Sequence, residues 1–160
     1  MKMKKCETPF GYAIFCDEVR IENTGKQIYI GVYNYEMVIP TGFPVRLRSL
    51  AVIANLAERP NESRDDVKFI VSYSGIDKPI AETIVPRADL DALPAPQREP
   101  EDGDLFDPIM AMTVVFNMVD VNLSGPGRIT VAAERGSESI HLARLKVSHS
   151  PIPQPVAIPA

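Results

Sequence analysis

The sequence predicts an all-β protein: an antiparallel sandwich of two sheets with seven or eight strands, immunoglobulin-like or jelly-roll-like, followed by an extended C-terminal arm. Three observations predict this fold class. Apolar and polar residues alternate with a period of two along most of the chain up to residue 147. Short clusters of turn-forming residues, mainly glycine, proline, asparagine and aspartate, separate the alternating runs. No segment shows the period of a helix over the length of a helix.

Two alternating runs near the N-terminus predict a β-hairpin. The first run covers residues 12–22, and the cluster Asn23-Thr24-Gly25-Lys26 then breaks the alternation. Residues 27–33 resume it, so we expect the two runs to pair as neighbouring strands. Residues 35–39 are expected to continue the second strand after an irregularity at Asn34.

The next strand is predicted to lie in the middle of a sheet. Residues 39–44 form a loop, because two prolines flank Gly42 and remove two backbone donors. The run 45–56 is polar at its start and becomes apolar on both faces from residue 50 to residue 54. A strand that is apolar on both faces is typical of the interior of a sheet, with its polar end near the rim.

Five more strands are expected: residues 67–74, 80–85, 109–121, 129–133 and 139–147. Residues 86–108 hold five prolines and a dense acidic group, which predicts a long loop, with 88–93 compatible with one helical turn. In the last strand the apolar face changes parity between Leu142 and Leu145, which predicts a β-bulge near Ala143. The resulting organisation is an N-terminal arm (1–11), one sandwich domain (12–149) and a proline-rich arm (150–160).

Composition excludes several classes of partner. The net charge of −4 carries no basic excess of the kind that binds phosphate backbones, so we expect no nucleic-acid partner. No apolar run approaches the ~20 residues of a membrane span, and the apolar run after the N-terminal lysines is too short for a signal peptide. We therefore expect no membrane partner, and a cytoplasmic protein or, if a phage encodes it, a virion component.

Cys6 and Cys16 match no zinc pattern, and two reduced thiols are favoured over a bridge between them.

The supply of catalytic residues is small, and we expect neither enzyme activity nor a cofactor. His141 and His149 have no partner at metal-type spacing, and no nucleophile elbow, phosphate loop or dinucleotide motif occurs. The acidic group in the long loop is the best candidate for a cation site, because calcium prefers several carboxylate oxygens on a flexible loop. The spacing of an EF-hand is missing, however, and a solvated acidic loop is the simpler interpretation. The candidate ligands are Glu101, Asp102, Asp104 and Asp107.

Two features are candidates for binding a protein partner. Tyr29 and Tyr33 share one face of the predicted hairpin; if that face is exposed it resembles an interface, and if a second sheet covers it, it belongs to the core. The sequence leaves both possibilities open. The proline-rich arm can lie along a neighbour's groove or add to the edge of its sheet. The candidate residues are Tyr29, Tyr33, Tyr35, Phe43, Pro151, Pro153, Pro155 and Ile158.

The N-terminal third resembles a family of bacterial and phage proteins of unknown function. The residues that carry the resemblance are Ala13-Ile14-Phe15-Cys16-Asp17, Gly25-Lys26, Ile30-Gly31-Val32-Tyr33, Pro40 and Pro44, and towards the C-terminus the strand from Pro126 to Val131 followed by Gly136. The resemblance implies a β-sandwich over about residues 12–147 and assigns no activity and no catalytic residue. The acidic proline loop and the C-terminal arm depart from the family's pattern.

Two functions remain open at this point. The first is a non-enzymatic module that self-associates or docks on a larger protein assembly such as a phage particle, for which the arm is the motivating feature. The second is a sandwich that binds a small ligand or a carbohydrate, with calcium in the acidic loop. The absence of tryptophan, a common platform for sugars, counts against the second.

Overall fold

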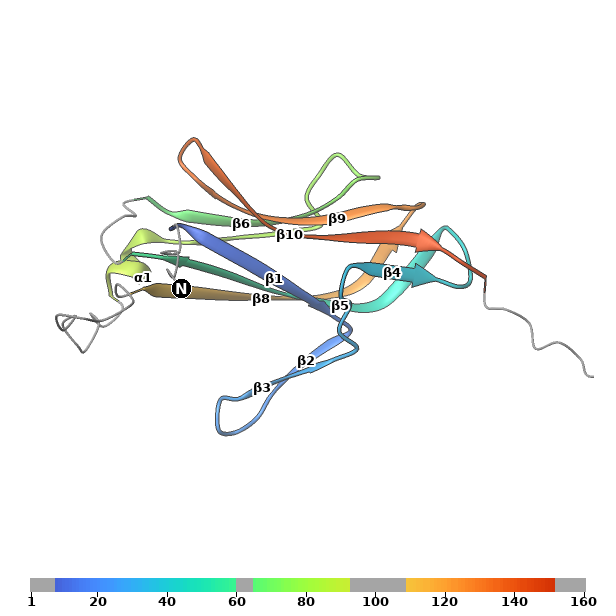
Figure 1. Cartoon of the computed structure of the whole chain (residues 1–160), viewed down its shortest axis with the longest axis horizontal. Helices are drawn as coiled ribbons and strands as arrows, with labels where there is room; N and C mark the ends of the chain where they lie inside the picture. Colours follow the sequence, from blue (N-terminus) through green and yellow to red (C-terminus); the bar gives the residue numbers. More distant parts are fainter. Residues whose placement is uncertain (1–7, 60–64, 93–108, 152–160) are drawn as a thin grey trace, which may run out of the picture.

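The computed structural model describes residues 8–59, 65–92 and 109–151. Figure 1 shows two layers of strands packed face to face, with a narrow two-strand ribbon that projects from one layer. The described residues form the following elements: β1 (Phe10–Cys16), β2 (Glu18–Ile21), β3 (Gln27–Ile30), β4 (Glu36–Ile39), β5 (Val45–Glu58), β6 (Val67–Tyr73), β7 (Ala81–Val85), α1 (Arg87–Asp91), β8 (Met110–Leu123), β9 (Gly127–Arg135) and β10 (Glu138–His149).

The sandwich consists of a three-stranded and a five-stranded sheet. The strand order is β1-β5-β8 in the smaller sheet and β4-β10-β9-β6-β7 in the larger one, while β2 and β3 pair only with each other. Strand β5 is central in its sheet, as its apolar run on both faces predicts. The prediction of an all-β two-sheet sandwich is therefore confirmed.

The core lies between the two sheets. Alternate residues of β5 and β8 point inward from the smaller sheet and meet alternate residues of β6, β9 and β10. This arrangement is the period-two pattern of the sequence folded into two facing layers. The fully or almost fully buried members include Leu50, Val52, Leu56, Phe69, Val71, Tyr73, Leu123, Ile129, Val131, Leu145 and Val147.

The structure corrects the predicted first strand. Residues 12–22 do not form one strand, because the chain turns at Asp17 between β1 and β2. β1 pairs with β5 over its whole length, from Phe10 opposite Ala57 to Cys16 opposite Ala51. Only β2 pairs with β3. Alternation alone missed the corner, since a strand that changes partners keeps its period of two.

A second correction concerns residues 35–39, which do not extend the preceding strand. They form β4, a separate edge strand that pairs in parallel with the end of β10, Met37 lying opposite Val147. The larger sheet is therefore mixed and not purely antiparallel, and the described residues form ten strands where seven or eight were predicted. The β-bulge expected near Ala143 is confirmed by a register shift between His141 and Ala143.

An ion pair closes one end of the sandwich. Arg135, at the end of β9, contacts Glu58, at the end of β5, with 2.5 Å between Nη2 and Oε2. Glu58 is fully buried and the side chain of Arg135 is 9% exposed. Because burying a charge without a partner is costly, this contact ties the two sheets together where their strands end.

Candidate interaction surface

The ribbon formed by β2 and β3 is attached to the sandwich by a hydrogen-bonded stem. The backbone N–H of Asp17 donates to the carbonyl of Ile30 at 2.9 Å, and the N–H of Tyr33 donates to the carbonyl of Phe15 at 2.8 Å. The hydroxyl of Tyr33 donates to Oδ1 of Asp17 at 2.5 Å. These contacts join the two ends of the ribbon, so its direction is set before any partner binds.

Gly31 allows this stem to form. Its φ is +68°, a conformation that residues with a side chain rarely adopt. A Cβ atom at this position would collide with Oδ2 of Asp17. The carboxylate that accepts the hydrogen bond of Tyr33 therefore occupies the space that a side chain at residue 31 would need.

The inner face of the ribbon covers part of the smaller sheet. Val19 and Tyr29 pack with a small buried cluster of Cys16, Ala51 and Ile53 on the side of the sheet that faces away from the main core. Cys16 is a free cysteine with no solvent exposure, and its burial raises the pKa of the thiol. One face of the ribbon thus covers the cluster around Cys16, and the rest of the ribbon projects beyond the smaller sheet.

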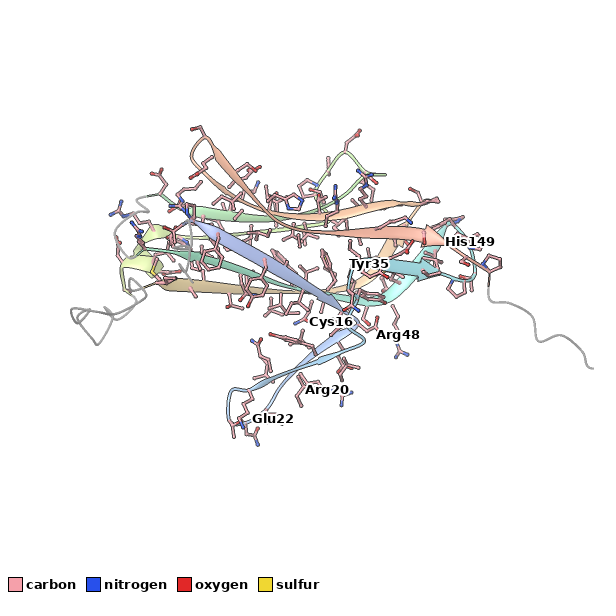
Figure 2. All side chains as sticks on the ribbon, in the orientation of Figure 1. Cys16, Arg20, Glu22, Tyr35, Arg48 and His149 are labelled. Atoms are coloured by element: carbon pink, nitrogen blue, oxygen red, sulfur yellow. The ribbon has the colours of Figure 1, made fainter. Side chains whose placement is uncertain are left out.

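The outer face of the ribbon is exposed, with apolar side chains on β3 and charged side chains on β2. Ile28, Ile30 and the following Val32 are 43%, 36% and 49% exposed. Glu18 lies opposite Ile30 and Arg20 opposite Ile28, and these two charged residues form an ion pair with 2.8 Å between Nε and Oε1. We call Ile28, Ile30, Val32 and Tyr35 the hairpin surface; Figure 2 shows Cys16 at the root of the projecting ribbon, with Arg20 and Glu22 further out.

The structure decides which way the predicted tyrosines point. Tyr29 and Tyr33 lie on partly buried faces, where Tyr29 covers the cluster around Cys16 and Tyr33 packs against the main core. Phe43 is also partly buried against the core. Tyr35 is 76% exposed, and it is the one of these four aromatic residues that meets solvent broadly. The hydrogen bond to Asp17 holds the ring of Tyr33 in place. Burial, as the larger cause, and this hydrogen bond, as the second, both raise the pKa of the Tyr33 hydroxyl.

Sequence reasoning did not select the isoleucines as surface residues. Their alternation with the tyrosines was visible, but a period of two does not say which of the two faces meets solvent. The charged residues Glu18 and Arg20 are the signal that could have found them. In the hairpin these two residues lie opposite Ile30 and Ile28 and so share their face, and charged residues rarely face a core.

The remaining predicted residues are placed as follows. Pro151 is exposed directly after β10, while Pro153, Pro155 and Ile158 lie outside the described residues, as do all four candidate calcium ligands of the acidic loop. Within residues 8–59, 65–92 and 109–151, no group of three or more histidine, cysteine, aspartate or glutamate side chains could hold a metal ion. His149 contacts the carbonyl of Ile39 through Nδ1 at 2.8 Å, which fixes the end of β10.

The described part of the chain contains no helix that is long and apolar enough to cross a membrane.

The fold and the stem together define a two-sheet β-sandwich with a projecting β-hairpin. Residues 11–148 match a family of unknown function (DUF6941), and the chain belongs to that family. The match ends just before the proline-rich arm. No curated protein and no solved structure matches the chain.

Proposed function

We propose that the protein is a non-enzymatic interaction module that docks on a larger protein assembly, of which a phage particle is one kind, through the hairpin surface. The observation that carries the proposal is the combination of a clamped stem with an outward apolar face at Ile28 and Ile30. A ribbon that served only to cover the sheet would need its inner face alone.

The energetics favour such a role. A rigid projection loses little conformational freedom when a partner binds, so more of the contact energy appears as affinity. Interfaces commonly have an apolar centre and a polar rim, and the ion pair of Glu18 and Arg20 lies directly beside the isoleucines. β2 and β3 have hydrogen-bonded strand partners only in each other among the described residues, so their outer edges also offer backbone groups to a partner strand.

The test is site-specific photo-crosslinking in cells that produce the protein naturally. A photoreactive phenylalanine analogue replaces Ile28 in one variant and Ile84 in a matched control, which is an exposed isoleucine on the edge strand β7, away from the ribbon. The proposal predicts a defined crosslinked species with Ile28 and not with Ile84. The double variant Ile28→Ser/Ile30→Ser should then lose the same partner in a binding assay while its melting temperature stays close to that of the parent.

Two results would contradict the proposal. One is the same set of crosslinked species from both positions, which would indicate non-specific contact. The other is a partner identified by other means whose affinity is unchanged in the double variant.

A further inference from the structure

A groove runs along the free side of the smaller sheet. Two adjoining hollows of about 460 and 470 Å³ share Ile76 and Asn122 in their walls. One wall is the second half of β8 from Met118 onward, and the other is the connection between β6 and β7, with Pro79 and Ile80. At one end the groove reaches Pro44, at the start of β5.

The wall formed by β8 is an unpaired strand edge. β8 is 14 residues long and pairs with β5 on one side, and no strand of the described residues pairs with its other side. Its sequence contains one ionisable side chain, Asp120, and Val119 is 74% exposed. Proteins usually protect an edge of this kind with charges, prolines or a covering segment, because its free N–H and C=O groups accept another strand. The groove is therefore suited to an apolar strand.

The C-terminal arm has the composition of such a strand. Prolines occupy residues 151, 153 and 155, and residue 159 is also proline, so all four have odd numbers. In an extended chain, alternate residues direct their N–H and C=O groups to the same edge. All even positions from Ile152 to Ile158 keep their N–H and would share one edge. The prolines would lie on the opposite edge, where proline is tolerated because that edge faces solvent.

The even positions also share one face. They are Ile152, Gln154, Val156 and Ile158, three of them apolar, which suits the apolar walls of the groove. One edge of the arm can thus add to a sheet, and the other edge prevents further addition. The arm would end the sheet in the way that edge prolines do in natural sheets.

The arm cannot easily turn back to its own groove. Proline holds φ near −65°, and residues 150, 152 and 154 each precede a proline, which disfavours the helical conformation at these three residues. The sequence of residues 150–155 therefore favours a chain that continues away from β10 over one that folds back.

A second copy is the partner that this geometry favours. β10 ends at the same end of the sandwich as the turn between β8 and β9, as Figure 1 shows. His149 contacts the loop that leads to Pro44, at the mouth of the groove. In a pair of copies related by a two-fold axis, each arm would leave its own sandwich close to the groove of the other, so the exchange can be reciprocal.

We infer that the C-terminal arm of one copy adds as an edge strand to β8 of a second copy, in the groove between β8 and residues 75–80. The inference deepens the proposed interaction function and rests on it, because it names a second copy of the chain as one partner. The hairpin surface remains free for a different partner, since it belongs to β2, β3 and the residues that follow them.

The first experiment places a proline on each edge of the arm in the full-length chain. Val156→Pro removes an N–H from the pairing edge, and Ala157→Pro, one residue later, adds a proline to the edge that is already blocked. Light scattering of the parent should show a mass of at least twice 17.6 kDa. Val156→Pro should reduce the mass to that of one chain, and Ala157→Pro should leave it unchanged. Val156→Ala, which keeps the N–H, should weaken association less than Val156→Pro.

The second experiment tests the groove. Ile76→Glu puts a charge into the wall that both hollows share, and Ile84→Glu is the matched control on an exposed part of β7 that lines neither hollow. The first should reduce the mass to that of a monomer, and the second should not. Both positions are exposed, so a thermal melt should show that each variant is folded.

Mixing the two defective variants separates exchange between copies from docking within one chain. Ile76→Glu keeps an intact arm and Val156→Pro keeps an intact groove, so the mixture should recover a heterodimer with one junction. A parent protein that is monomeric at tens of micromolar, or equal effects of Val156→Pro and Ala157→Pro, would overturn the inference. A mass unaffected by Ile76→Glu would overturn the assignment to this groove.

The same measurement distinguishes this inference from the proposed function. The double variant at Ile28 and Ile30 should keep the mass of the parent, because the hairpin surface is not part of the groove. If the arm variants leave the mass unchanged and crosslinking at Ile28 still captures a specific partner, the exchange fails and the hairpin function stands. If the hairpin variant alone dissociates the oligomer, self-association uses the ribbon and the exchange fails.

Discussion

Replacing Tyr33 by phenylalanine removes one hydroxyl from the stem of the ribbon and leaves the ring in place. That hydroxyl donates to Oδ1 of Asp17 at 2.5 Å, and the ring packs against the main core. A hydrogen bond to a charged group contributes about 1.5–3 kcal/mol, and because Asp17 is exposed to solvent we reduce this contribution to about 1–2 kcal/mol. The folded protein should lose stability by that amount.

Urea unfolding measures the loss. With a slope of about 2 kcal/mol per molar urea, in the middle of the usual range, the midpoint should fall by roughly 0.5–1 M. Tyr35→Phe is the matched control, because Tyr35 is exposed, and it should change stability by less than about 0.5 kcal/mol. A double-mutant cycle with Asp17→Ala should give a coupling energy of about 1–2 kcal/mol, since each single change removes the same contact.

The dependence on pH gives a second, independent readout of the same contact. Burial and the hydrogen bond to Asp17 raise the pKa of Tyr33 above its ordinary value of 10.0. The folded protein therefore holds this proton more tightly than the unfolded chain, and the resulting stability is fully present below pH 10 and is lost as the pH rises above it. The parent should lose more stability between pH 9 and 11 than Tyr33→Phe, with both values chosen to bracket a pKa of about 10. Equal losses in Tyr33→Phe and Tyr35→Phe, or parallel pH curves, would refute the role given to this contact.

Three further outcomes are expected. Gly31→Ala should cost about 1–3 kcal/mol more than Gly25→Ala, because both positions have a positive φ but only residue 31 lacks space for a Cβ, and chemical denaturation compares them. Arg135→Met should lower the free energy of unfolding by about 3–5 kcal/mol, because it removes the guanidinium group that contacts the buried carboxylate of Glu58. Arg46→Met, which breaks an exposed ion pair, should cost less than about 1 kcal/mol in the same assay. After the other cysteine is replaced by serine, the thiol of Cys16 should react with a thiol reagent only when the protein unfolds, and rapid labelling of the native protein would show that the ribbon does not cover it.

The positions of most strands follow from the sequence alone. The runs at 45–56, 67–74, 80–85 and 139–147 agree with β5, β6, β7 and β10 to within two residues at every end, because apolar residues recur along each strand where it faces the core. The bulge near Ala143 was also predictable, since the apolar residues change parity there. Local patterns of this kind depend on which residues face the core, and the spacing of apolar residues in the sequence shows which these are.

The ribbon shows where local information ends. The apolar residues of the run 12–22 keep the same parity on both sides of Asp17, which interrupts them only once, yet β1 pairs with β5 and β2 pairs with β3. Choosing between those partners depends on contacts with residues far along the chain, such as Ala51 opposite Cys16. The alternation of side chains predicts that one face of a strand is buried, but it does not show which other element packs against that face.

The sequence by itself determined that this chain is a β-sandwich, where most of its strands lie, and that the prolines after residue 150 all stand at odd-numbered positions. Only the tertiary structure decided that Tyr29 and Tyr33 turn inward while Ile28 and Ile30 turn outward, and that β8 has no strand on its outer side among the described residues. The physical reason is that alternation defines two faces of a strand but does not assign them. The choice between core and solvent is made when the second layer packs, through contacts between residues that are distant in sequence.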